Sequence, residues 1–429
     1  MPPEVARRGP NGAVLILLAT AVGGGAGYLL QIVTGVALGT AAYASFAVFW
    51  SALYLLVSAL SGAQQEIARA THPVDRSGAG PGETRRAPVV RNFTLVAVVA
   101  VAAILAGSAW IWVGGVFPDE GWALVPPLVL GVSAYLVVAA VSGVLYGLSF
   151  WVAAAAMTVI DGVLRFALVG GLLLVTTDTA VLAWGVALPF AVTPVVLWLF
   201  IRRGVVGRFA VDVGPRELSW NVLRTVVAAA ATGVMVSGLP LMIQATGDTV
   251  SPDAFGSLTY AITLTRAPIV IVVLALQSYL VVVFRSHADA VLGWVARLSA
   301  LVLVGAGLLA LLAWWLGPWA LSVLFGRSDV LAGGTIGLLV ATAGLVGVLC
   351  VTGAATLSRA QHGAFAGGWI LAAVVTVGML LLPLGLHERT ILALTVGPVA
   401  GLLLQGAALF RQPRADVAGA DAPPVPPTA

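Results

Sequence analysis

Three charged side chains lie deep inside long apolar segments of this chain: Asp161, Arg165 and Arg266. A charge at the centre of a membrane helix costs about 2.5–3.5 kcal/mol on insertion scales, so each of them requires a structural or functional reason. A guanidinium group suits bidentate binding of phosphate and other oxyanions. Arg266 has no acidic residue within one helical turn on either side. We therefore interpret Arg266 as a candidate anion ligand, with hydrogen bonding to carbonyls of a neighbouring helix as the structural alternative.

Asp161 and Arg165 are four residues apart, which places them on one face of a helix within pairing distance. One interpretation is a self-neutralising pair that lets the helix insert into the membrane, and the other is a functional charge pair. Both stay open at this point. Under either interpretation, this face of the helix lies against protein or water and not against lipid.

Neutral polar residues accompany these charges in the first, second, seventh and eighth apolar segments. Singly, such a residue more often hydrogen-bonds a neighbouring helix than a ligand. Their concentration in four segments favours these segments as the lining of a space between two halves of the protein. The candidate lining residues are Gln31, Tyr54, Gln244, Tyr260 and Gln277.

The sequence contains no recognisable catalytic or cofactor-binding pattern. H-E-x-x-H, D-x-D, P-loop and nucleophile-elbow motifs are absent. The single cysteine, Cys350, and four scattered histidines argue against a metal site. We therefore expect no enzymatic activity, no cofactor and no bound metal.

The composition indicates that lipid is the main solvent of this chain. It has 429 residues, of which 60% are apolar and 9% charged. Lipid requires the backbone to satisfy its own hydrogen bonds, and no period-two alternation suggests strands, so we expect an all-α polytopic membrane protein. The segments long enough to span the membrane are 13–36, 42–62, 93–116, 123–147, 150–175, 180–201, 220–246, 254–283, 294–316, 331–356, 364–385 and 391–410.

The distribution of basic residues predicts the orientation. All 21 are arginine, and most lie in the two tails and the even-numbered connections, whereas the opposite side carries only Arg327 and Arg389. The positive-inside rule then places both termini in the cytoplasm.

The absence of lysine and the abundance of Ala, Gly and Val suggest a GC-rich bacterial genome, so we expect a bacterial cytoplasmic membrane. The net charge of +4 reflects this topology and not nucleic-acid binding.

The chain reads as two related halves. Thr34-Gly35 recurs as Thr246-Gly247, an offset of 212 positions (246 − 34), and later similarities keep the same offset. Six spans in each half give both halves the same orientation, as parallel repeats about an axis along the membrane normal. The expected divisions are a cytoplasmic tail (1–12), two six-helix bundles (13–201 and 220–410), a cytoplasmic linker (202–219) and a disordered tail (411–429).

Two stretches carry a resemblance to a known family: "ALGTAAYASFAVFWSALYLLVSALSGAQQEIAR" (37–69) and "AFGSLTYAITLTRAPIVIVVLALQ" (254–277). They resemble bacterial polysaccharide-biosynthesis flippases, the oligosaccharide-lipid exporters of the multidrug/oligosaccharidyl-lipid/polysaccharide (MOP) superfamily. The resemblance implies a MATE-like fold and alternating-access export of a polyprenyl-diphosphate-linked oligosaccharide from a central cationic cavity. Arg266, in T-R-A-P, resembles the arginine-proline pair of helix eight in that family. Arg165 falls where the family carries an arginine in helix five. Asp161 is not a residue that the family pattern accounts for, which leaves open whether Arg165 is free to bind an anion.

The implied partners are a lipid-linked glycan and membrane lipid, with a coupling ion under an antiporter reading and no nucleic acid. Three alternatives remain open. A cation-coupled small-molecule antiporter of the same superfamily needs a titratable carboxylate, for which Asp161 is the candidate. A membrane enzyme of cell-surface glycan assembly needs a catalytic loop, which we do not find. A lipid-binding scaffold without transport would make Arg266 structural.

Overall fold

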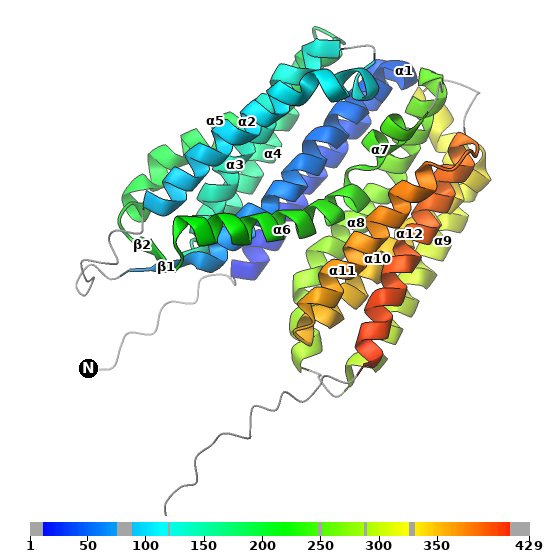
Figure 1. Ribbon diagram of the computed structural model, residues 1–429. Coiled ribbons are helices and arrows are strands. Elements are labelled where there is room, and N and C mark those ends of the chain that lie inside the picture. The colour runs from blue at the N-terminus through cyan, green and yellow to red at the C-terminus, as the bar shows by residue number, and fades with distance from the viewer. Residues whose placement is uncertain are drawn as a thin grey trace, which may run out of the picture.

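The computed structural model describes residues 12–74, 88–118, 121–247, 251–286, 290–325 and 331–411. Within α8 the side chains of residues 267–279 are not described, and they include Gln277. Over the described residues the protein is helical apart from two short strands (Figure 1). The elements are α1 (Gly12–Ala70), β1 (Thr71–Pro73), α2 (Pro88–Val116), a 3₁₀ turn (Gly121–Leu124), α3 (Val125–Gly147), α4 (Trp151–Leu173), α5 (Thr179–Val205), β2 (Phe209–Val211), α6 (Pro215–Val236), α7 (Leu239–Thr246), α8 (Pro252–Ser286), α9 (Val291–Phe325), α10 (Gly333–Ser358), α11 (His362–Leu380) and α12 (Leu386–Phe410).

The helices confirm a polytopic membrane protein. Ten helical stretches among the described residues are long and apolar enough to cross a membrane. The first of them, α1, contains two spans, because Gly39 breaks it at φ 73° and ψ 177°, a conformation that glycine adopts at little cost. The two spans fold back on each other, since the Tyr43 hydroxyl donates to Gln31 Oε1 at 3.2 Å. Counting α1 as two spans gives eleven, and the 35-residue α8, which is not among the ten, gives the expected twelve.

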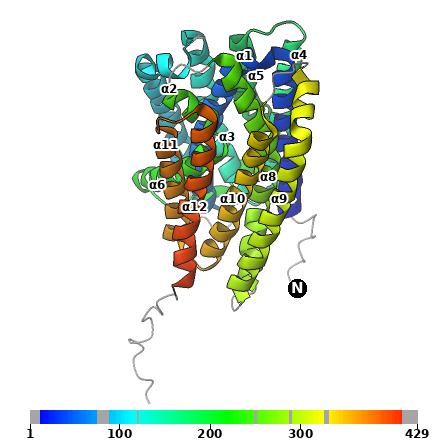
Figure 2. The same ribbon diagram turned by 90° about the vertical axis from the view of Figure 1, so that its right-hand side faces the viewer.

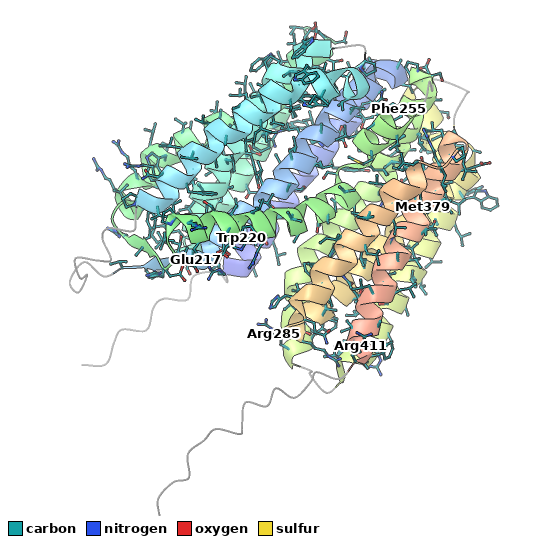
Figure 3. The ribbon with its side chains drawn as sticks, in the orientation of Figure 1. Glu217, Trp220, Phe255, Arg285, Met379 and Arg411 are labelled. Carbon is teal, nitrogen blue, oxygen red and sulfur yellow. The ribbon has the colours of Figure 1, made fainter. Side chains whose placement is uncertain are left out.

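The helices form two groups that meet at one end of the molecule. The first group contains α1 to α5 and the second contains α8 to α12 (Figures 1 and 2). They converge near α7 and the start of α8 and diverge toward the end where α12 finishes. Figure 3 shows Phe255 at the converging end, whereas Arg285 and Arg411 lie at the diverging end, as does Trp220 in the first group. We call the converging end the outer end and the surface between the groups the seam.

The segment expected as one span over 220–246 is two helices. α6 ends at Val236 and α7 begins at Leu239, with Ser237 and Gly238 between them. α6 packs along the second span of α1, where Thr225 Oγ1 donates to the Gly62 carbonyl at 2.9 Å. A Cβ on Gly62 would lie 2.5 Å from the Thr225 carbonyl carbon, so the two backbones are in close contact. The start of the second repeat is therefore packed on the first.

The linker between the repeats contains a strand that the sequence did not indicate. β1 and β2 pair antiparallel, with Thr71 opposite Val211 and Pro73 opposite Phe209. The Asp212 amide also donates to the Ala70 carbonyl at 3.1 Å. The helices extend into the expected linker 202–219 from both sides, since α5 continues to Val205 and α6 starts at Pro215. What remains of the linker is fastened to the end of α1.

Candidate functional site

A cavity of about 270 Å³ lies at the seam, in the middle of the helices. Both spans of α1, the break between α6 and α7, and α8 provide its walls. We call it the central cavity. It is lined by Gly23, Gly24, Gly27, Tyr28, Gln31, Ala47, Trp50, Ser51, Tyr54, Val236, Ser237, Leu239, Pro240, Ile262, Thr263 and Arg266.

Arg266 is the only charged residue among these lining residues. Its side chain is 5% exposed, and its Nε and Nη2 atoms are buried without a hydrogen-bond partner in the described part of the chain. It takes part in none of the three ion pairs formed by the described residues. A buried charge normally has a counter-ion or several hydrogen bonds. The two unsatisfied N–H groups beside a cavity are suited to an oxyanion.

Aromatic and neutral polar groups line the rest of the central cavity. Trp50 and Tyr54 stack with ring centroids 4.5 Å apart, and both line the cavity. The Tyr28 hydroxyl donates to the Leu264 carbonyl at 2.8 Å, two residues before Arg266, and so connects the two repeats. None of the residues that line the central cavity is acidic. The cavity therefore combines one cation, aromatic surface and hydrogen-bonding groups.

The break between α6 and α7 opens directly into the central cavity. Ser51 Oγ donates to the Ser237 carbonyl at 2.7 Å and accepts from the Leu241 amide at 3.1 Å, so one hydroxyl satisfies both sides of the break. α7 starts at the cavity, and a helix N-terminus carries partial positive charge. With the offset of 212, Ser237 corresponds to Gly25 in the glycine cluster of α1. Both repeats therefore place a break or a glycine cluster at this depth.

Asp161 and Arg165 form the pair that their spacing predicted. The two guanidinium nitrogens donate to the carboxylate at 2.7 and 2.9 Å, and Arg165 Nε donates to the Val186 carbonyl of α5 at 3.0 Å. The guanidinium lies 4.3 Å from the Phe190 ring centroid and 5.7 Å from that of Tyr54. Arg165 is thus fully engaged behind the Tyr54 wall. Neither member of the pair lines the central cavity.

The structure brings three of the eight expected site residues, Gln31, Tyr54 and Arg266, to the central cavity. Gln244 lines a different cavity at the outer end. Tyr260 is 1% exposed, donates to the Ile32 carbonyl at 3.3 Å and packs edge-on against Tyr43. The Gln277 side chain lies outside the described residues. For all eight, a role in binding stays a prediction.

Tyr28 and Trp50 are lining residues that the sequence analysis did not select. The spacing of both residues from a selected residue could have identified them. Tyr28 precedes Gln31 by three residues and Trp50 precedes Tyr54 by four, so each shares a helix face with a selected residue.

Tight contacts close the seam between the central cavity and the outer end. Gly35 lies against the Tyr260 ring and Gly256 against the Thr40 backbone, and neither position has room for a Cβ. Thr40 Oγ1 also hydrogen-bonds the Asp253 carboxylate. These contacts join α1 to α8 across the two repeats. The structure is therefore closed at its outer end.

The arrangement of two helical groups around a central cavity defines the class of fold. An inward-facing MATE family transporter of the MOP superfamily superposes with a TM-score of 0.65 at 15% identity, over 92% of this chain and 98% of that one. The lipid II flippase MurJ in an inward closed conformation gives a TM-score of 0.65 at 9% identity, over 93% and 88%. A MOP superfamily transporter from Pyrococcus furiosus gives 0.60 at 16% identity, over 93% and 95%. The chain has the MOP transporter fold.

Sequence relatives identify the family more closely. The uncharacterized protein Rv1510 of Mycobacterium tuberculosis is 32% identical over 381 residues, which cover 87% of this chain and 85% of the relative. The uncharacterized protein Mb3654 of Mycobacterium bovis is 28% identical over 398 residues, covering 92% and 90%. No protein-family model matches the sequence. The chain belongs to the same protein family as Rv1510.

Proposed function

We propose that this protein is a flippase that moves a polyprenyl-diphosphate-linked oligosaccharide, or a related anionic glycolipid, from the cytoplasmic to the outer leaflet by alternating access. The observation that carries this proposal is Arg266, a buried guanidinium beside the central cavity with two unsatisfied N–H groups. A diphosphate offers the bidentate acceptor that these groups lack. One solved structure with this fold is a lipid II flippase, which supports a lipid-linked substrate.

The other lining groups fit a glycan-bearing head group. Tyr54 and Trp50 present aromatic faces that suit sugar rings, while Gln31 and Thr263 add hydrogen-bonding groups. The prenyl chain stays in lipid, because a cavity of about 270 Å³ is too small to receive it as well as the head group. The head group therefore enters the seam and the tail remains in the bilayer.

The proposed orientation places the diverging end in the cytoplasm of a bacterium. This end carries Arg285 and Arg411, in agreement with the positive-inside rule (Figure 3). Both termini would then be cytoplasmic, and the closed outer end would face away from the cell. The bacterial relatives support a cytoplasmic membrane.

The direct test replaces Arg266 with alanine in protein reconstituted into liposomes. The measurement is the rate at which a fluorescent prenyl diphosphate crosses the bilayer, read by quenching from outside. We expect Arg266→Ala to slow transfer at least about tenfold, since a charge-assisted hydrogen bond contributes about 1.5–3 kcal/mol. Arg266→Lys keeps the charge without the bidentate geometry and should retain part of the rate.

Arg224→Gln is the matched control, because Arg224 is an exposed arginine whose guanidinium lies over the Trp220 ring at 4.9 Å. It removes one positive charge away from the central cavity and should leave the rate unchanged. Transfer by Arg266→Ala at the wild-type rate would remove Arg266 from the mechanism and with it the proposed function.

A cation-coupled small-molecule antiporter is the second candidate. The stacked Trp50 and Tyr54 rings in the central cavity favour it, as does the likeness to MATE transporters. The arrangement of Asp161 argues against it, since this carboxylate is held by Arg165 and does not line the cavity. Proton-driven dye efflux that is lost on Asp161→Asn would favour the antiporter. The reading as a membrane enzyme has no observation in its favour among the described residues.

A further inference from the structure

A second cavity, of about 380 Å³, lies at the outer end of the seam. We call it the outer cavity. Residues of α1, α2, α7, α8 and α12 line it, and its polar groups include Ser45, Gln244 and Arg389. It follows the central cavity along the same helices, since Ala47 lines the central cavity and Val48 the outer one. The contacts of Gly256 and Tyr260 with α1 lie beside it. The two cavities are thus arranged in series along the seam.

Arg389 gives the outer cavity a buried and incompletely satisfied cation. Its side chain is 8% exposed, although the sequence placed it on the open outer face. Nη1 donates to the Thr246 carbonyl at 3.2 Å, whereas Nε is buried and has no hydrogen-bond partner in the described structure. No described carboxylate forms an ion pair with it. Arg389 therefore differs from the fully engaged Arg165 and resembles Arg266.

The position of Arg389 on its helix adds to the positive charge at the outer cavity. It lies in the first turn of α12, where the helix dipole is positive and an acidic group is preferred. The N-cap residue, Gly385, provides no capping side chain. Glu388 lies in the same turn, but it is exposed and forms no ion pair with Arg389. A buried guanidinium and a helix N-terminus thus act together at this cavity.

A purely structural role explains only part of this arrangement. The bond to Thr246 joins the start of α12 to the end of α7, so Arg389 connects two helices at the seam. This bond uses Nη1 and leaves Nε unsatisfied. A hydrogen bond that only joins α7 to α12 also does not require a cavity beside it, or the Gln244 side chain in the lining of that cavity.

We propose that the outer cavity is a second anion-binding site, centred on Arg389 and Gln244, for a phosphate or diphosphate group. Nε of Arg389 and the amide of Gln244 supply the donors. As a step in transport, which rests on the proposed function, this site receives the head group after the seam closes behind it on the cytoplasmic side. Binding at the outer cavity does not itself depend on transport.

The test is calorimetric titration of the full-length protein in lipid nanodiscs with inorganic pyrophosphate. We expect two binding sites in the wild type. Arg389→Gln should remove one of them, and Gln244→Ala should weaken the same one several-fold. Arg389→Lys serves as the fold-preserving variant and should retain weakened binding. Arg224→Gln, which removes an exposed charge, should retain both sites.

The outcomes separate the two proposals. Two unchanged sites in Arg389→Gln, or no second site in the wild type, would overturn the outer site. Two unchanged sites in Arg266→Gln would instead overturn the central site and leave the outer one standing. A parallel titration with farnesyl diphosphate identifies the source of the phosphate. Tighter binding than pyrophosphate at the outer site indicates a lipid-linked group, and equal binding indicates a free one.

Discussion

The buried arginines Arg165, Arg389 and Arg266 differ in how many of their N–H groups have a hydrogen-bond or ion-pair partner. Arg165 has a bidentate carboxylate, a carbonyl and an aromatic face. Arg389 has one carbonyl, and Arg266 has two unsatisfied nitrogen atoms. Removing a charge from water costs several kcal/mol unless partners replace the water. The number of unsatisfied N–H groups therefore separates an arginine that holds helices together from one that is ready for a ligand.

The Asp161–Arg165 pair gives a prediction about stability. Asp161→Asn leaves Arg165 buried without its counter-ion, and breaking a buried pair costs about 3–5 kcal/mol. We expect a marked decrease in the thermal unfolding temperature of the detergent-solubilised protein. The double variant Asp161→Asn/Arg165→Gln removes both charges and should recover much of the loss.

Transport by the double variant then separates the two interpretations of this pair. Wild-type flipping together with recovered stability indicates a structural pair. Lost flipping in a stable double variant would show that the charges act in transport.

Sequence reasoning identified Asp161, Arg165 and Arg266 as charges inside apolar segments, but it did not give the tertiary surroundings of every buried charge. Spacing alone was enough to predict the Asp161–Arg165 pair, because both partners lie on one helix. Arg389 was placed on the open outer face, since its burial arises from α7 and the wall of the outer cavity, which are remote in sequence. Tyr260 likewise turned out to pack inside the α1–α8 contact. Local patterns do not report such tertiary surroundings.

The α6–α7 break depends on one hydroxyl from another helix. Ser51 bonds both the Ser237 carbonyl and the Leu241 amide. Pro240 contributes as well, because proline lacks an amide hydrogen and is accepted in the first turn of a helix. Such breaks at mid-membrane are tolerated only where they are buried in protein or line a cavity. The break and the cavity therefore require each other.

We expect Ser51→Ala to destabilise the protein by about 1–3 kcal/mol, the usual penalty for leaving a buried polar group unsatisfied. The flipping rate should also fall, since the cavity wall at Ser237 loses its anchor. Thermal unfolding and the liposome assay measure the two effects. Ser219→Ala removes an exposed hydroxyl of α6 and should change neither. An unchanged unfolding temperature for Ser51→Ala would show that the break is maintained without this contact.

The break was not predictable from the sequence of 220–246 alone. The segment has the length and apolarity of one span, and a proline such as Pro240 can kink a helix without dividing it. Its division depends on Ser51, almost 190 residues away, and on the packing of α6 against α1. The paired strands β1 and β2 were missed for the same reason, since each is three residues long and stabilised only by the other.

Alternating access requires the closed outer end to open. Thr40 and Asp253 hydrogen-bond across the seam at this end, so cysteines at these positions should form a disulfide. We expect Thr40→Cys/Asp253→Cys, in a Cys350→Ser background, to lose flipping on oxidation and to regain it on reduction. The liposome assay with and without reductant measures this effect.

Each single cysteine variant is the control and should respond to neither reagent. Normal transport by the oxidised double variant, with the disulfide verified by mass spectrometry, would show that the head group does not leave through this end.

The twelve spans and the two-repeat organisation were accessible from the sequence, because span length is a local property and the repeat appears as a constant offset between similar stretches. The packing partner of α6 was not. The repeat assigned α6 to the second half, and α6 in fact packs on both groups. Thr225 contacts Gly62 of α1. Ala231 and Met235, in contrast, pack against α10 and α11. A glycine such as Gly62 indicates that another backbone can pack closely against it, but the sequence does not indicate which helix that backbone belongs to.

The pairing of β1 with β2 determines how the two repeats can move. Without this pairing, the connection between α5 and α6 would be a flexible linker that lets the two halves move independently. The pairing of β2 with β1 fixes the linker next to Ala70 at the end of α1, so that only Asp212 to Gly214 separate the paired strands from α6. The next interruption of the helices after the paired strands is the break at Ser237 and Gly238, which lies beside the central cavity. If the two groups rock about this break during transport, we expect the same movement to change the shape of the central cavity.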